Sequence, residues 1–334
     1  MSDGGFTVLD GTQLRLLSLP LTVKTPTDSN SAVVTGAYVI DLVESEASSS
    51  LFGVSLPENL KSSALKRAVS GKYDVAFFRS KELDADHASE VATNYLTAIA
   101  DELKYDPIVV SILDGNTLRL FLEDEDDFAM LAENLFTDLD IEDKGKICKG
   151  QMRNALVNMG VDMGIPPFSE FPLLNDILKK HGAEGEEELG QAQFAHLLQL
   201  VLQDVADAVA EKHVIVVQNI KIINGTKLRT LLADEKQLNS VIEKMHQEKN
   251  SLESELESTD IIRGFLEKKG KELGMPPSEA NEAVVLLYDA IFADVKSSKT
   301  TAKTDDDFRE LVKDILEKFA EQLNVNPVYH SSEY

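Results

Sequence analysis

The sequence of 334 residues lacks tryptophan, contains a single cysteine (Cys148), and is poor in positive charge. One cysteine excludes an internal disulfide and favours a reducing compartment. We therefore expect a cytoplasmic protein, with the nucleus as an additional location. Lys and Arg number 33 against 58 Asp and Glu, which gives a formal net charge of −25. Because nucleic acids and anionic membranes are bound through Lys and Arg, we expect neither as a partner. A cation or a basic protein surface suits this charge better.

Long apolar runs and catalytic motifs are also missing. The most apolar helix-like stretch, 283–295, is too short to span a bilayer and contains Asp289 and Asp294. The N-terminus has no basic segment followed by an apolar one, so we expect no signal peptide. The sequence has no glycine-rich phosphate loop, no nucleophile elbow and no metal-ligand spacing of histidines. We therefore expect a protein that is not an enzyme. Leu, Ala, Glu and Lys are abundant, which favours helix.

A motif that occurs three times dominates what is present. Its copies are VLDGTQLRLL, ILDGNTLRLFLEDEDDF and IINGTKLRTLLADEKQL, which begin at Val8, Ile112 and Ile222. Each has two apolar residues, then Asp or Asn, Gly, two variable residues, Leu and Arg. A glycine between a β-branched run and a helix supplies a permissive backbone, and Asp or Asn suits a turn. The motif therefore predicts a strand, a tight turn and a helix.

The arginine of this motif has two interpretations. It pairs with neighbouring acids, such as the run from Glu123 to Asp127, or it binds a phosphate or a partner. The density of carboxylates in the local sequence favours pairing. The three arginines are Arg15, Arg119 and Arg229.

Two further markers recur in the same order. NMGVDMGIPP (158–167) returns as KKGKELGMPP (268–277), and LFGVSLPEN (51–59) is a weaker echo. An amphipathic helix that runs into a β-prone segment closes each unit, at 95–110, 201–217 and 315–328. Such self-similarity at a fixed period predicts repeated units. We predict three of them, a first unit 1–110, a middle unit 111–220 and a third unit 221–334.

The middle unit contains the segment LFTDLDIEDKGKICKGQM (135–152). Apolar residues at helical spacing predict one helix before the segment and another after it. Between these helices lies a twelve-residue window from Asp140 to Gln151, with Gly145 at position 6 and Ile147 at position 8. A helix, a loop of this length with glycine at its sharp turn, and a second helix are typical of an EF-hand.

EF-hand loops are usually paired, and a second window, 182–193, follows. It begins at Gly182, has Glu184, Glu186 and Gln193 at positions 3, 5 and 12, and places Leu189 at position 8. The two apolar residues at position 8, Ile147 and Leu189, are predicted to face each other in a two-stranded link between the loops.

The candidate metal ligands of the first window follow from its numbering. A calcium loop has acids at positions 1, 3 and 5, a backbone carbonyl at 7 and a bidentate Glu at 12. Lys144 at position 5 and a neutral amide at position 12 depart from this set, so we expect weak or conditional Ca²⁺ binding. The alternative interpretation makes Asp140 a residue of a helix C-terminus or turn. The candidate ligands are Asp140, Glu142, Lys146 through its backbone carbonyl, and Gln151.

The outer units are expected to be degenerate versions of the middle one. Segment 242–260 is charged and predicts a solvated helix or helix–turn–helix, and segment 18–34 predicts a loop. Segment 296–308 predicts a loop that ends in a helix capped by Thr304 or Asp305. The predicted fold class is mainly α, with three divergent EF-hand-pair-like helical units and short two-stranded β links.

The segments 106–140, GKI (145–147) and GMPPS (274–278) resemble a plant family of EF-hand calcium-binding proteins. Its members include a calcium sensor that binds and inhibits stress-activated sucrose-non-fermenting-related kinases. The resemblance covers mainly 105–205 and implies a soluble calcium sensor or kinase regulator. It carries over to Asp140 and Gly145, loosely to Glu142, and not to Lys144, where the family has an acid.

Two functions are compatible with these observations. The first is a calcium-binding regulatory protein of EF-hand type that binds a protein partner, with a stress kinase as the partner that the resemblance implies. In it, the cation would move helices and expose a groove holding Met152, Met159 and Met163. The alternative is a calcium-independent helical scaffold or adaptor with vestigial loops.

Overall fold

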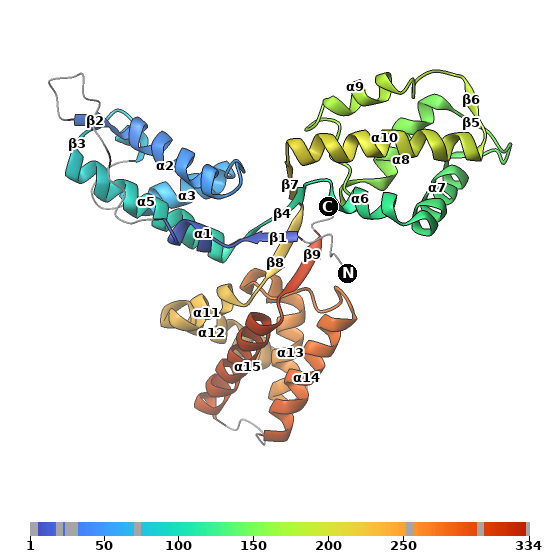
Figure 1. Ribbon diagram of the computed structural model, residues 1–334. Coiled ribbons are helices and arrows are strands. Elements are labelled where there is room, and N and C mark those ends of the chain that lie inside the picture. The colour runs from blue at the N-terminus through green and yellow to red at the C-terminus, as the bar shows by residue number, and fades with distance from the viewer. Residues whose placement is uncertain are drawn as a thin grey trace. The chain divides into compact units, whose positions relative to one another are not determined.

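A computed structural model describes residues 6–17, 23, 33–69, 75–251, 257–298 and 304–331. The protein is mainly helical, with small sheets between the helices (Figure 1). Within the described ranges, no helix combines the length and apolarity that a membrane span requires. The contacts divide the chain into two compact bodies. Strand β1, residues 44–56 and residues 109–218 form one, and the rest of the described chain forms the other.

The middle unit consists of two helix pairs around one core. Its elements are β4 (Ile108–Leu113), α6 (Asn116–Glu123), α7 (Glu125–Leu139), β5 (Ile147–Cys148), α8 (Met152–Met159), α9 (Leu173–Lys180), β6 (Glu188–Leu189), α10 (Gln191–Glu211) and β7 (Val214–Gln218), with short 3₁₀ helices η1 (Lys149–Gln151) and η2 (Val161–Met163). The core contains the buried residues Leu135, Phe136, Leu156, Leu174 and Phe194. The rings of Phe136 and Phe194 lie 5.8 Å apart, so α7 and α10 are joined across the core.

The third unit repeats the order of the helices and of the outer strands, and its described residues contain no counterpart of the link strands β5 and β6. It has β8 (Ile220–Ile223), α11 (Thr226–Ala233), α12 (Glu235–Ser251), α13 (Ser258–Lys269), η3 (Gly270–Leu273), α14 (Glu282–Ser298), α15 (Asp305–Val325) and β9 (Val328–Ser331). Of segment 242–260, for which a solvated helix or helix–turn–helix was predicted, α12 covers 242–251 and α13 covers 258–260, and residues 252–256 lie outside the described residues. Ile242 and Met245 are buried rather than solvated. Thr304 caps α15 as predicted, because its hydroxyl accepts the Asp307 N–H at 3.1 Å.

The first unit has β1 (Phe6–Leu9), α1 (Thr12–Arg15), β2 (Val33–Thr35), α2 (Gly36–Ser50), α3 (Glu58–Val69), α4 (Val75–Phe78), β3 (Glu82–Asp84) and α5 (Ala85–Tyr105). Strand β2 pairs with β3, and the buried Val34 lies opposite the buried Leu83. The prediction of a loop over 18–34 is therefore wrong at its end, where β2 begins. The rest of that segment, apart from Val23, lies outside the described residues.

The closing helices run into strands as predicted, and they are equally long. α5, α10 and α15 each have 21 residues, and β4, β7 and β9 follow them. Each closing strand pairs with the strand that opens its own unit. β1, β4 and β7 form one sheet in that order, and β8 pairs antiparallel with β9.

The three-stranded sheet departs from the predicted two-stranded links. It forms because the six residues of β4 serve twice, as the closing strand of the first unit and as the opening strand of the middle one. β4 pairs antiparallel with β7 from Val109 opposite Gln218 to Leu113 opposite Val214. A single short apolar run in a sequence does not show how many strands it pairs with, so the pairing of β4 with both β1 and β7 could not be predicted from the sequence.

Candidate functional site

The loop between α7 and α8 is closed by the carboxylate of Asp140. Asp140 is the residue that ends α7, and its two carboxylate oxygens accept the N–H groups of Lys144 at 3.0 Å and Gly145 at 2.6 Å. Gly145 has a φ of 66°, in the left-handed region that favours glycine. Asp140 therefore acts as a turn residue in this structure, in line with the alternative interpretation of the sequence.

The strand link beyond this turn is the one that the sequence predicted. β5 and β6 pair antiparallel, and Ile147 lies opposite Leu189. Both side chains are buried in the core of the middle unit. The two strands lie side by side at one end of this helical group (Figure 1). The register of the link follows from burying these two residues, since a shift by one residue would turn both toward solvent.

Three lysines of the first loop are paired with carboxylates. Lys144 pairs with Glu142 inside the loop, and two further pairs connect the loops. Lys146 lies 3.4 Å from Glu188, and Lys149 pairs with Glu187. Each pair is exposed and contributes little stability by itself, about 0–1 kcal/mol. Together the lysines place positive charge where a calcium loop needs carboxylates free for the metal.

The remaining candidate ligands also have partners within the protein. The Gln151 side-chain oxygen accepts from the Asn154 amide at 2.5 Å. In the second window, the Gln193 side-chain oxygen accepts the Gly190 N–H at 3.1 Å, so position 12 caps α10. The described residues include no group of three or more His, Cys, Asp or Glu side chains placed to hold a metal ion. As arranged here, the loop residues do not fit a calcium cage, which needs six to eight oxygens.

A lysine–carboxylate pair also fixes the entry to the second loop. Asp204 on α10 accepts from Lys180 at 2.6 Å and lies 2.7 Å from His181 Nε2, at the C-terminus of α9. The Lys180 hydrogen bond, followed by the one from His181, lowers the pKa of Asp204. This contact joins α9 to α10 immediately before the second window, 182–193.

The turn of the repeated motif has the same geometry in all three units. The Asp or Asn side chain accepts the N–H two residues later, and the glycine has a φ between the left-handed values of 71° and 82°. A Cβ on that glycine would lie 2.3–2.6 Å from a carbonyl oxygen of the closing helix. The triplets of acceptor, glycine and facing carbonyl are Asp10, Gly11 and Ala100; Asp114, Gly115 and Ala206; and Asn224, Gly225 and Ala320.

The motif arginines pair, but not with the acids that the sequence suggested. Arg119 contacts Asp207 at 3.1 Å, on the closing helix and 88 residues away, rather than the neighbouring run 123–127. Arg229 reaches a neutral side chain at the same end of its unit, Asn324, at 2.7 Å. The arginines therefore fasten the opening helix of each unit to its closing helix.

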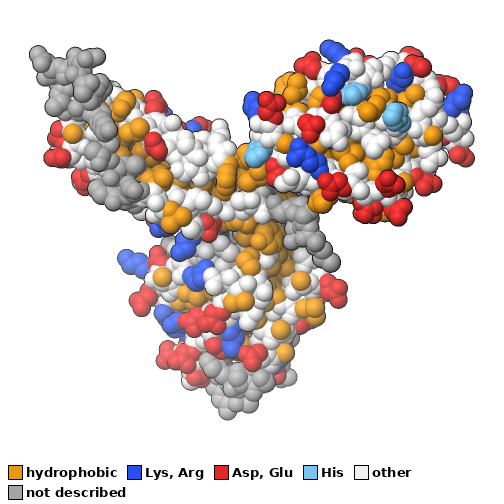
Figure 2. All heavy atoms as spheres, viewed as in Figure 1, with side chains coloured by type: hydrophobic (Ala, Val, Ile, Leu, Met, Phe, Trp, Pro, Cys, Tyr) orange, Lys and Arg blue, Asp and Glu red, His pale blue; other side chains and the backbone are white. Residues whose placement is uncertain are grey.

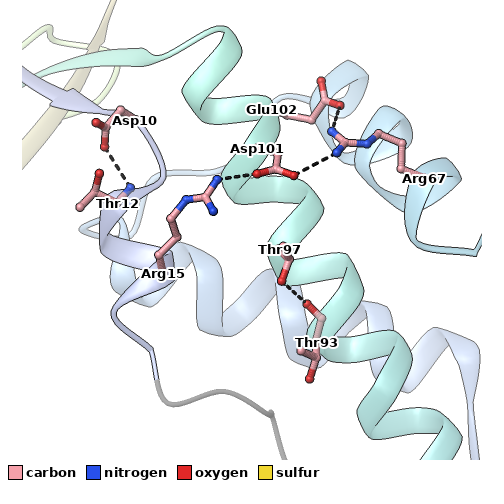
Figure 3. A network of polar contacts seen from close by, with 8 residues as sticks. All are labelled: Asp10, Thr12, Arg15, Arg67, Thr93, Thr97, Asp101 and Glu102. Carbon is pink, nitrogen blue, oxygen red and sulfur yellow. Dashed lines mark hydrogen bonds and ion pairs between the residues drawn. The ribbon is translucent and has the colours of Figure 1, made fainter. Parts of the chain in front are cut away.

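In the first unit this contact is part of a larger network (Figure 3). Arg15 pairs with Asp101 of α5, whose other oxygen lies 3.0 Å from Arg67 of α3. Arg67 also contacts Glu102 at 3.0 Å. The hydrogen bond that Arg67 donates to Glu102 is the largest cause of the raised pKa of Arg67, and the one that it donates to Asp101 adds to it. Three helices are joined through two adjacent carboxylates.

The second repeated motif, 158–167 and 268–277, packs against the helix of the first motif. Ile165 donates its N–H to Gly160 at 3.0 Å, and Met275 donates to Gly270 at 2.9 Å. The next glycine of each copy, with a positive φ, packs against the opening helix. Gly164 lies against Leu118, and Gly274 lies against the aliphatic stem of Lys227. Sequence reasoning found this marker as a repeat and assigned it no role.

A surface groove in the third unit was not predicted. It encloses about 760 Å³ between α14, α15 and β9. Figure 2 shows hydrophobic side chains gathered over β9 and the adjoining part of this helical group. Leu286 and Tyr329 in the lining are 60% and 52% exposed. Other lining residues are Leu287, Ala290, Ile291, Val328, Lys318 and Glu321.

The charges at the groove differ from those of the other units. Lys318 pairs with Asp294 at 2.6 Å. Glu321 follows Ala320, as Asp101 follows Ala100 and Asp207 follows Ala206. Arg229 contacts Asn324 instead, and the negative charge of Glu321 contributes to the raised pKa of Lys318, after the larger effect of the Asp294 hydrogen bond. By contrast, Met152 and Met159 of the groove expected in the middle unit are buried in its core.

Comparisons with known proteins add no relative to this geometry. No protein-family model, no curated protein and no solved structure matches the chain.

Proposed function

We propose that the protein is a helical adaptor of EF-hand-like units that binds a protein partner without requiring calcium. The observation that carries the proposal is the set of internal partners in the loop pair. Asp140 is used by backbone N–H groups, and Glu142, Glu187 and Glu188 are used by lysines of the first loop. The loops then serve as a structural link between two helix pairs.

Electrostatics support this assignment over calcium binding. A cation at the loop centre would meet the ammonium of Lys144, which now lies on Glu142. Two like unit charges about 4 Å apart near a protein surface repel by about 4 kcal/mol, and a divalent ion increases this. The Gln151 amide supplies one neutral oxygen in place of the two anionic oxygens of a Glu. Binding would therefore begin with the loss of existing pairs.

The groove beside β9 supports the partner-binding part of the proposal. An apolar groove with exposed Leu286 and Tyr329 suits the apolar face of an amphipathic helix. Glu321 at its edge and the net charge of −25 favour a helix that also carries a basic side chain. A protein kinase is the class of partner that the family resemblance implies.

Calcium regulation is the second candidate, and one feature favours it. Asp140 and Gly145 stand at positions 1 and 6 of a twelve-residue window whose strand link has formed. In this candidate Ca²⁺ would displace Lys144 and use Asp140, Glu142, the Lys146 carbonyl and Gln151. The two candidates differ in whether the wild-type loop takes the ion at micromolar concentration.

A calorimetric titration of Ca²⁺ into the full chain, at physiological salt with Mg²⁺ present, separates them. We expect no saturable heat for the wild-type protein. Lys144→Asp combined with Gln151→Glu restores the missing acids, and we expect this variant to gain saturable binding. Lys236→Asp with Gln237→Glu changes the charge equally on exposed positions of α12 and is the control. Saturable heat for the wild type that Asp140→Ala abolishes would overturn the adaptor assignment.

The partner surface is tested with a stress-activated kinase of the class implied by the resemblance. Its affinity for the full chain is measured with calcium and with a chelator. We expect the same affinity in both, and about a tenfold loss on Leu286→Ser, because burying a leucine side chain contributes about 1.5 kcal/mol or more. Val157→Ser alters a side chain of α8 that is 58% exposed and is the matched control. Equal loss in both variants, or dependence on calcium, would contradict the proposal.

A further inference from the structure

A second, smaller pocket lies between the end of α5 and the third unit and is lined by three lysines and a histidine. It encloses about 160 Å³ beside the turn at Gly225. Lys221 of β8, Lys227 of α11, Lys271 of η3 and His330 of β9 all line it. Lys221 and His330 are directly opposite each other in the β8–β9 ladder. Asp106 is the one carboxylate residue among the lining residues. In a chain with a net charge of −25, this concentration of positive charge is unusual.

The lysines among these residues stand apart from the ion pairs of the described chain. Within the described part of the chain, neither Lys221, Lys227 nor Lys271 has a carboxylate within 4.0 Å. The stem of Lys227 packs against Gly274, and its ammonium lies 5.1 Å from the centre of the Tyr105 ring. This contact holds the ammonium at the pocket without neutralising it. The middle unit, by contrast, pairs Lys144, Lys146 and Lys149 with glutamates.

The middle unit provides an internal comparison for this pocket. The residues that correspond to Lys221, Lys227, Lys271 and His330 in the repeat are Ser111, Thr117, Val161 and Val216. The turn of the third unit has also lost a negative charge. Its acceptor is Asp114 in the middle unit and Asp10 in the first, whereas the third unit has the neutral Asn224. The backbone geometry is common to the units, so the positive charge is a property of the third unit alone and is not needed for the turn.

We propose that this pocket binds a phosphoryl group. The three lysines of the lining have no carboxylate partner in the described chain, and like charges gathered at one pocket favour an anion as ligand. A phosphate carries about two negative charges and several acceptor oxygens, so it can accept from several lysines at once. The replacement of Asp by Asn224 removes the carboxylate that would repel it. The phosphoryl group comes either from free phosphate or from a phosphorylated side chain of a partner. This site is independent of the loop pair and of its proposed function.

The test is a titration of inorganic phosphate into the full chain at constant ionic strength, followed by calorimetry and by the amide NMR signals of 221–227. We expect saturable binding. Lys221→Gln with Lys271→Gln should weaken it about tenfold or more, because each lost charge-assisted hydrogen bond contributes about 1.5 kcal/mol or more. Lys227 is kept because its stem packs on Gly274. Lys313→Gln with Lys318→Gln removes the same charge from α15 and should leave the affinity unchanged.

A second pair of variants tests the turn without altering a lysine. Asn224→Asp keeps an acceptor for the Thr226 N–H and introduces the charge found in the other units. We expect it to weaken phosphate binding about fivefold, since a negative charge is added beside the site. Asp114→Asn in the middle unit should have no effect. Absence of saturable binding, or equal losses in the α15 control, would overturn the proposal.

The source of the phosphoryl group is separated by a second titration. A phosphoserine peptide is compared with inorganic phosphate and with the unphosphorylated peptide on the same protein. Tighter binding of the phosphopeptide that also depends on Lys221 and Lys271 assigns the site to a modified partner. Equal affinity for phosphate and phosphopeptide assigns it to the free anion. Equal affinity for the phosphorylated and unphosphorylated peptides contradicts a phosphoryl site.

Discussion

The turns at Gly115 and Gly225 share one backbone and differ in charge. Both glycines have positive φ angles and lie against a carbonyl of the closing helix. At Gly115 the acceptor is Asp114, and the nearby arginine is paired with Asp207. At Gly225 the acceptor is neutral, and the arginine reaches a neutral side chain. Packing therefore fixes the shape of the turn, while the charges around it are free to vary with function.

The lysines of the two units differ in whether they are paired with carboxylates. In the middle unit, the loop lysines neutralise acids of their own loops, which stabilises a link between helix pairs. In the third unit, the lysines at the turn have no carboxylate partner within the described chain and line a pocket. Side chains that are satisfied internally support structure, whereas unsatisfied charge gathered in a pocket is available to a ligand.

The largest predicted loss in the free energy of unfolding comes from substituting the turn glycine, which both units share. Gly115→Ala would place a Cβ 2.3 Å from the Ala206 oxygen at a φ of 82°. We expect it to lower the free energy of unfolding by about 3 kcal/mol or more, because the clash adds to backbone strain of about 1–2 kcal/mol. Gly225→Ala should have a similar effect in the third unit. Urea unfolding followed by circular dichroism measures both.

Two other glycines make this prediction specific. A Cβ on Gly145 would meet nothing within 4 Å, so Gly145→Ala should cost only its strained φ of 66°, about 1 kcal/mol. Gly264 lies inside α13 with open space around it, and Gly264→Ala should stabilise the helix by up to about 1 kcal/mol. If Gly115→Ala lowered the free energy of unfolding no more than Gly145→Ala, the close approach to the closing helix would not be what requires glycine at this turn.

The repeat itself could be predicted because local backbone needs leave a local signature. Glycine and an Asp or Asn acceptor are required within three adjacent positions, so the turn is visible in the sequence. The pairing of Ile147 with Leu189 was predictable for a different reason, because both stand at position 8 of a twelve-residue window of EF-hand type, and the structure pairs them. The partner of Arg119 could not be predicted, because Asp207 is 88 residues away and many nearer acids compete. Its position depends on where α10 ends.

Some features of the candidate site were likewise visible in the sequence, and others required the fold. Lys144 and Gln151 already departed from a calcium loop in the sequence. That Lys144 lies on Glu142, and that Lys146 and Lys149 reach the second loop, required the fold. The cationic pocket was missed entirely, because its lysines come from β8, α11 and η3 and are separated by up to 50 positions in the chain. The fold brings them to one pocket, and the comparison of corresponding positions shows that the middle unit has no lysine at any of them.

A buried tyrosine provides the next largest difference between the units. Tyr288 of α14 is 1% exposed and donates its hydroxyl to the Pro276 carbonyl at 3.2 Å, where the middle unit has Leu178. Burial raises the pKa of Tyr288 to about 12. The unfolded chain therefore releases this proton first as the pH rises above about 10. The resulting stabilisation is fully present below pH 10 and is lost as the pH approaches 12, by about 2 kcal/mol.

Tyr288→Phe isolates this effect from the titration of other groups. At neutral pH the variant should lose about 1 kcal/mol, the usual contribution of one hydrogen bond. Between about pH 9 and about pH 12 its stability should fall less steeply than that of the wild type. The measurement is urea unfolding at a series of pH values. Parallel curves for the two proteins would show that Tyr288 is not the group responsible.

The arginine contacts give the smallest and most selective effect. Arg119 and Asp207 have side chains that are 40% and 61% exposed, so Arg119→Ala should cost only about 0.5 kcal/mol. That cost should shrink at high salt, because exposed charge pairs are screened. Arg229→Ala should lose a similar or smaller amount with no salt dependence, since Asn324 is neutral. Asn324→Asp should give the third unit the salt-sensitive pair of the middle unit, and Asp207→Asn should remove it there. Urea midpoints at low and high salt test both exchanges. Equal salt dependence for Arg119→Ala and Arg229→Ala would mean that the two turns do not differ electrostatically, which would remove the basis for assigning a ligand to one of them.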